Sequence, residues 1–160
     1  MKRGEKGILI GMVVVVLTLM VVNFFRQQGL DEHAKDIPFY TTANPELSRQ
    51  GGLLYKRLAC KKCHSLWTVK DIMQTVPAPA MDGMGSLRSE DWLFKYFSAE
   101  NPQAILSSRL KKEFQMPSYS ALSLDDRKLL SAYISSLKVE DWYLEETKRA
   151  ECKKLTGEAC

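Results

Sequence analysis

The longest apolar run of this chain lies close to its N-terminus. Residues 8–25 carry no charge, and only Thr18 and Asn23 interrupt the run with polar side chains. Counted from Gly7, these 19 residues would form a helix of about 28 Å, close to the roughly 30 Å of a bilayer's hydrocarbon core. The pattern therefore predicts one N-terminal transmembrane helix.

The charges on either side of this segment predict its orientation. Basic residues precede it, whereas acidic residues follow it beyond Arg26; they are Lys2, Arg3 and Lys6 before, and Asp31, Glu32 and Asp36 after. The positive-inside rule then places the N-terminus in the cytoplasm and the chain after residue 26 outside. A cleaved secretory signal is the alternative, although the run exceeds the usual apolar core and lacks a small-x-small cleavage site. Either interpretation predicts that the rest of the chain is exported.

A first helix of the exported part is predicted to begin after Asn44, a favourable N-cap, with Pro45 at its first position. Its apolar stripe consists of Leu47, Leu54, Tyr55 and Leu58. Gly51 and Gly52 interrupt the helix, and each should cost about 1 kcal/mol relative to alanine. Such a cost indicates that another backbone approaches closely.

Three later helices are predicted, over residues 90–98, 103–110 and 124–137. Ser89 and Ser123 are suitable N-caps for the first and the last of them, and Pro102 opens the middle one. No segment alternates clearly enough to predict a strand. The fold class is therefore predicted to be all-α, with loops around residues 65–88 and 108–122.

The stretch "YKRLACKKCHSLW" contains the densest candidate chemistry, the C-x-x-C-H motif of Cys60, Cys63 and His64. This arrangement is typical of covalent haem attachment. On a short helical segment the two thiols share one face and can add to the porphyrin vinyl groups, and the next residue presents an imidazole to the iron. A thioredoxin-like pair would require a βαβ context, a zinc site a second close cysteine pair, and a structural disulfide would leave His64 without a role.

A haem iron needs a second axial ligand, and the candidates are Met73, Met81, Met84, Met116 and His33. Met116 is favoured because it lies 52 residues after His64, just before the last predicted helix, with Pro117 to stiffen its loop. Met81 and Met84 have packing against the ring or the core as their simpler role, and His33 that of a solvated side chain.

The sequences "GGLLYKRLACKKCH", "PAMDGMGSL", "MPSY" and "LLSAYISSL" resemble the class I cytochrome c domain of small bacterial type, over residues 44–137. The resemblance implies a class I cytochrome c fold around one covalently bound haem c. It also implies that the first and last helices cross at a glycine. Gly51 or Gly52 would then meet the face around Leu130 and Tyr133.

The resemblance further implies that a proline carbonyl orients the proximal imidazole, and Pro79, or otherwise Pro77, is at the matching position. Together with Pro79, we expect Tyr55 and Trp92 to lie in the haem environment. With His64 and Met116 as axial ligands, no iron position stays open, and a thioether ligand raises the reduction potential. One-electron transfer, without enzymatic activity of the chain itself, is therefore the predicted function.

Around these residues the chain is moderately basic, with 13 Lys and Arg against 9 Asp and Glu between residues 44 and 137. Four lysines near the expected haem edge are candidate docking residues for an acidic redox partner: Lys61, Lys62, Lys111 and Lys112. A role in solubility alone is the alternative.

The predicted partners are redox proteins, most simply the other subunits of a respiratory membrane complex. We expect neither a nucleic-acid partner nor a small-molecule substrate. The anchor, "CHSL", "MPSYSALS" and an Asp-Trp pair are also loosely similar to the small haem-c subunit of bacterial nitric-oxide reductases. A tethered electron shuttle remains an alternative, as does a peroxidase or gas sensor in which Met116 is labile. The expected location is the bacterial cytoplasmic membrane, with the haem domain on the periplasmic side.

The chain thus divides into residues 1–25, a stub and anchor; 26–43, a tether; 44–137, the cytochrome c domain; and 138–160, an extension. In an oxidising compartment Cys152 and Cys160 most simply pair with each other, although a link to another subunit is an alternative. The extension is either a solvated helix packed on the haem domain or a docking segment.

Overall fold

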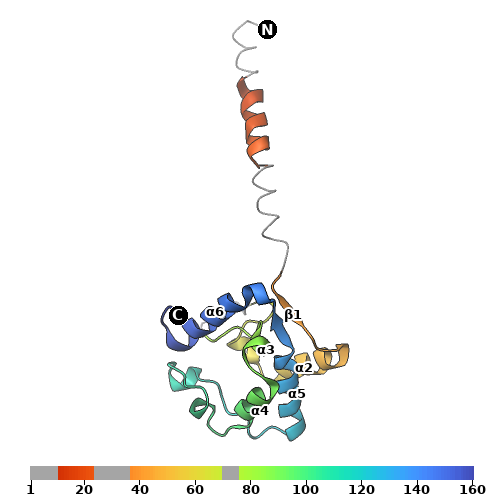
Figure 1. The fold of residues 1–160 in the computed structure, drawn as a ribbon, viewed down its shortest axis with the longest axis vertical. Helices are drawn as coiled ribbons and strands as arrows, with labels where there is room; N and C mark the ends of the chain where they lie inside the picture. The colour runs from red at the N-terminus through yellow and green to blue at the C-terminus, as the bar shows by residue number, and fades with distance from the viewer. Residues whose placement is uncertain (1–10, 24–36, 70–75) are drawn as a thin grey trace. The chain divides into compact units, whose positions relative to one another are not determined.

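The computed structural model describes residues 11–23, 37–69 and 76–160. It divides the chain into two units, one reaching Ile37 and the other running from Pro38 to Cys160 (Figure 1). In the first unit residues 11–23 are helical. Within the described ranges no helix combines the length and the apolar character that a membrane crossing requires. The ends of the predicted span, at 8–10 and 24–25, lie outside the described residues.

Helix α2, Pro45–Arg57, begins as its sequence predicts. The Asn44 side chain accepts a hydrogen bond from the backbone N–H of Leu47 at 2.8 Å, and Pro45 occupies the first turn. Leu54 and Tyr55, from the predicted apolar stripe, are 3% and 2% exposed. The helix therefore directs its apolar face into the core and leads directly into the C-x-x-C-H motif.

Two further helices complete the scaffold, α4 over Glu90–Ser98 and α5 over Leu124–Ser135. Ser89 and Ser123 cap them as expected, each accepting a hydrogen bond from an N–H three residues on. α5 packs against both α2 and α4. The helix predicted over 103–110 is wrong in extent, because only a 3₁₀ turn, η2 at Pro102–Ala104, forms there.

The remaining helical elements are short or follow the predicted domain: η1 Cys60–Lys62, α3 Met84–Leu87, η3 Lys112–Phe114, η4 Asp141–Tyr143 and α6 Leu144–Thr156. Each predicted loop region thus contains one short helical element, α3 in residues 65–88 and η3 in residues 108–122.

Two short strands correct the prediction that the domain has none. β1, Phe39–Thr41, pairs antiparallel with β2, Leu137–Val139, with Tyr40 opposite Lys138. Strands of three residues are too short to show an alternating pattern, and their partners are far apart in sequence. The last predicted helix accordingly ends at Ser135, short of residue 137. The end of the predicted tether also belongs to the second unit, which begins at Pro38.

The crossing of α2 and α5 depends on Gly51. A Cβ atom at this position would lie 2.4 Å from both Cβ and Cγ of Tyr133, whereas at Gly52 the nearest atom is the Tyr133 hydroxyl at 3.9 Å. The Tyr55 ring packs edge-on against Tyr133, with ring centroids 6.3 Å apart. The predicted helix contact at the glycine pair is confirmed, and Gly51 is the residue that makes it.

We expect the substitution Gly51→Ala to lower the free energy of unfolding by about 2 kcal/mol, the typical cost of overpacking a core. Gly52→Ala is the matched control, because its methyl group meets no close contact. It should raise that free energy by up to about 1 kcal/mol through helix propensity. Guanidinium unfolding of the two variants measures both effects, and equal destabilisation would contradict the assigned crossing.

Candidate functional site

The C-x-x-C-H motif forms a tight turn directly after α2. Ala59 precedes it in the left-handed conformation, with φ of 57°, and Cys60 opens the 3₁₀ turn η1. The backbone N–H groups of Cys63 and His64 both donate to the Cys60 carbonyl, at 3.2 and 2.9 Å. This turn brings the two cysteines and the histidine to the wall of one cavity.

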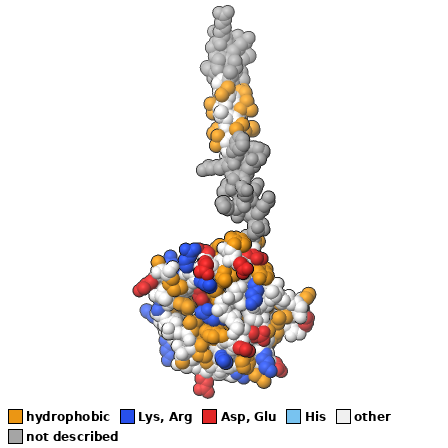
Figure 2. Space-filling view, viewed as in Figure 1, with side chains coloured by type: hydrophobic (Ala, Val, Ile, Leu, Met, Phe, Trp, Pro, Cys, Tyr) orange, Lys and Arg blue, Asp and Glu red, His pale blue; other side chains and the backbone are white. Residues whose placement is uncertain are grey.

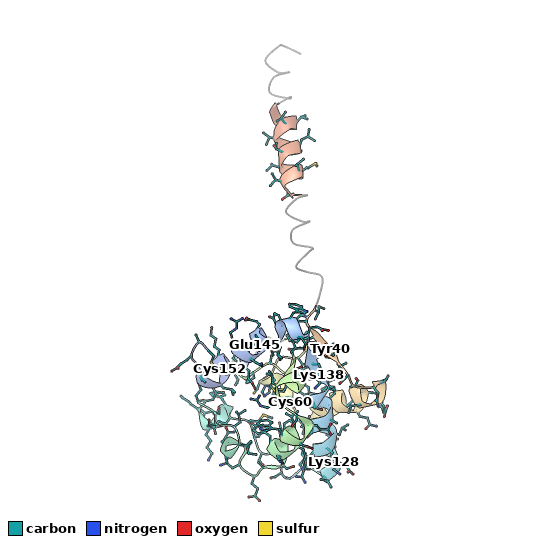
Figure 3. The ribbon with its side chains drawn as sticks, viewed as in Figure 1. Tyr40, Cys60, Lys128, Lys138, Glu145 and Cys152 are labelled. Carbon is teal, nitrogen blue, oxygen red and sulfur yellow. A yellow bond between two sulfur atoms is a disulfide. The ribbon has the colours of Figure 1, made fainter. Side chains whose placement is uncertain are left out.

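That cavity has a volume of about 320 Å³ and is lined by residues of α2, α4, α5, α6 and the segments around residues 77–81 and 103–119. Its walls are largely aliphatic and aromatic, and include Leu58, Leu93, Tyr96, Phe97, Leu130 and Ile134. In Figure 3 the labelled Cys60 lies inside the second unit, whereas Lys128 lies at its edge. The site is therefore an apolar hollow within the core, with the thiols and the imidazole on its wall.

The His64 imidazole is oriented by a backbone carbonyl. Its Nδ1 lies 2.7 Å from the Pro79 carbonyl oxygen. Because a carbonyl oxygen only accepts hydrogen bonds, Nδ1 must be the donor, which leaves Nε2 unprotonated in the neutral ring. Burial lowers the pKa of His64, although the bond to Pro79 opposes this shift. The neutral ring is the form that binds a metal ion.

Cys60 is a buried residue, 9% exposed. Burial raises the pKa of Cys60 to about 11, and a hydrogen bond with Tyr119 partly offsets the effect. Burial likewise raises the pKa of the Tyr119 hydroxyl. Tyr119 also lines the cavity, so it is a site residue that sequence reasoning missed.

Three of the candidate methionine ligands line this cavity. Met81 and Met84 belong to the buried core, whereas Met116 is partly buried and packs against it. The side-chain amide of Gln103 donates to the Met116 carbonyl at 3.0 Å and ties the Met116 loop to η2. The other two candidates, Met73 and His33, lie outside the described residues.

The other predicted residues are placed as follows. Tyr55, Pro79 and Trp92 all line the cavity. Lys61, Lys62, Lys111 and Lys112 are exposed, and Lys62 alone among them also lines the cavity. The predicted disulfide between Cys152 and Cys160 is present, with 6.2 Å between the Cα atoms.

Sequence reasoning also missed the contribution of the C-terminal extension. Glu151, Lys154 and Leu155, all from α6, line the same cavity, and so does Arg88. The extension carries no motif, and its apolar positions are few, so only the folded chain reveals this contact.

These residues fit a covalently held haem c. Two thiols and an imidazole stand together on the wall of an apolar hollow, where a porphyrin would be shielded from water. The Tyr55 hydroxyl is buried against this hollow and has no hydrogen-bond partner within the described part of the chain. A buried polar atom of this kind ordinarily has a partner, and a bound group in the hollow would supply one.

The comparison with known families agrees with this chemistry. The sequence model of the family described as "Cytochrome c" matches residues 48–138, which is more than half of the chain. Neither the curated proteins nor the solved structures give a match. A cytochrome c domain implies one covalently bound haem c and, in general, electron transfer. On the site geometry and this match, the chain belongs to the cytochrome c family.

Proposed function

We propose that this protein is a membrane-anchored, periplasmic electron-transfer subunit whose single haem c has His64 and Met116 as axial ligands. The observation that carries the proposal is the convergence of Cys60, Cys63, His64 and Met116 on one apolar cavity. Haem c supplies one-electron chemistry at its iron, and the protein supplies attachment, axial ligands and exclusion of water.

Met116 is preferred to Met81 as the second axial ligand because of the segment that carries it. Met81 follows closely on Pro79, whose carbonyl holds His64, and its N–H bonds to the carbonyl of Ser65, the residue after His64. Met81 is therefore tied to the same side as His64. Met116 comes from a different segment, 52 residues beyond His64, and its loop is held by Gln103. A loop tied in this way supports a stable ligand more than the labile one that a peroxidase or gas sensor would need.

The fixed-subunit interpretation rests on the length of the connection. The second unit begins at Pro38, so only twelve residues, 26–37, separate it from the end of the predicted span. Twelve residues reach at most roughly 40 Å when fully extended. A connection this short suits transfer within a complex better than a long-range shuttle.

A docking role is proposed for the lysines near the cavity: Lys61, Lys62, Lys111 and Lys112. Figure 2 shows basic and acidic side chains interspersed over the visible face of the second unit. Steering of an acidic partner would therefore depend on local charges beside the cavity, and Lys62 is the one that lines it.

Native electrophoresis of membranes extracted in mild detergent tests the proposed function. We expect this chain in a large haem-staining band with constant companion proteins, which mass spectrometry would identify. A haem-stained band of the chain alone would favour the tethered shuttle. Recovery of the full-length chain in the soluble periplasmic fraction would contradict the proposed membrane anchor.

The substitution Met116→Leu tests the axial ligand. It should lower the reduction potential, because the thioether favours the reduced iron, and it should change the ferrous protein from unreactive to fully reactive with carbon monoxide. Met84→Leu is the control, since it replaces another methionine of the cavity wall at similar volume. Carbon monoxide difference spectra report the result, and equal behaviour of the two variants would exclude Met116 as the ligand.

The substitution Lys62→Glu tests docking charge. Oxidation of the reduced protein by ferricyanide, an anionic probe, should slow several-fold at low ionic strength, because a local attraction becomes a repulsion. The difference should shrink in high salt. Lys128→Glu, on the exposed side of α5, makes the same charge change away from the cavity. Stopped-flow rates that fall equally in both variants would show only an effect of net charge.

A further inference from the structure

Helix α6 belongs to the cavity wall although it lies beyond the region matched by the family, which ends at residue 138. Figure 1 shows α6 on the same side of the second unit as the segment around residues 102–114. The Arg109 side chain donates to the Lys154 carbonyl at 3.3 Å and so joins the C-terminal half of α6 to that segment, while the Cys152–Cys160 disulfide joins the last residue of the chain back to the helix. The extension is thus a fixed part of the site.

The most shielded charge pair involving α6 is Arg88 with Glu151, at 3.1 Å. The two side chains are 23% and 11% exposed, whereas the other ion pairs of this helix are largely exposed. The same guanidinium donates to the Leu87 carbonyl at 2.9 Å and lies over the Trp92 ring, 5.0 Å from its centroid. Arg88 therefore has a defined position on the cavity wall.

A fixed positive charge at this position would act on the iron. Oxidation adds one positive charge to the haem, and an uncompensated cation beside an apolar cavity opposes that step, because the surroundings screen it weakly. Glu151 supplies the compensating negative charge at the same wall. Lys154 also lines the cavity, but its side chain is exposed and therefore better screened by solvent.

We propose that Glu151 is a positioning residue that holds Arg88 against Trp92 and offsets its charge, so that the C-terminal extension lowers the reduction potential of the haem. The inference requires only the bound haem c. It is independent of Met116 ligation, of membrane anchoring and of the identity of any partner.

The test is an equilibrium redox titration of the holoprotein, followed by the visible absorbance of the haem. In Glu151→Gln the amide keeps the size of the side chain and removes its charge. The midpoint potential should therefore rise. Glu151→Asp keeps the charge and should stay closer to the wild-type potential than Glu151→Gln does.

Glu146→Gln is the matched control. It removes one negative charge from the same helix, but at an exposed pair with Arg149 that does not line the cavity. Its midpoint potential should equal that of the wild type. If Glu151→Gln moves the potential no further than this control, the proposal is wrong.

The double variant Arg88→Gln/Glu151→Gln separates charge from structure. With both charges removed, the midpoint potential should return toward the wild-type value. If the shift in Glu151→Gln came instead from damaged packing, the second substitution should make that shift larger. If Glu151→Gln fails to assemble with haem, Arg88→Gln is used in its place. Its midpoint potential should be lower than that of the wild type, and an unchanged potential would overturn the proposal. The Glu151→Gln shift should also persist in Met116→Leu, so a failure of the axial assignment would leave this test intact.

Discussion

The close approach of α2 and α5 at Gly51 is the contact on which the rest of the domain depends. α2 leads directly into the C-x-x-C-H turn, so its crossing point determines where Cys60, Cys63 and His64 enter the cavity. α5 also lines that cavity, and it is approached by α3, where a Cβ atom at Gly85 would clash with the Ser135 carbonyl oxygen. Gly51 and Gly85 thus let α2 and α3 each approach α5 so closely that no side chain would fit at the contact.

Around this framework the site is held largely by backbone groups. The Pro79 carbonyl orients the His64 ring, the Cys60 carbonyl closes the motif turn, and the Met116 carbonyl is held by Gln103. Backbone acceptors have few degrees of freedom, so they restrict the motion of these cavity residues at little further entropic cost. Such rigidity suits one-electron transfer, in which the site should change little between its two oxidation states.

The C-terminal extension forms part of the cavity wall. The sequence of the segment that follows the family domain allowed two interpretations, a solvated helix packed on the haem domain or a docking segment for a partner subunit. It packs on the domain, and its inner face supplies three residues to the cavity wall, while its outer face carries exposed ion pairs such as Glu145 with Lys148. The helix therefore adds cover and the negative charge of Glu151 to a cavity whose wall, within the family match, already carries Lys62 and Arg88.

The sequence by itself determined the features that depend on neighbouring residues. The motif of Cys60, Cys63 and His64, the capped starts of α2, α4 and α5, and the need for a close contact at the glycine pair all follow from local spacing and propensity. The tertiary structure alone decided that Gly51 makes the crossing, that β1 pairs with β2, and that Glu151 meets Arg88. These features join positions separated by about sixty to one hundred residues, and no local pattern encodes which distant segment will arrive beside them.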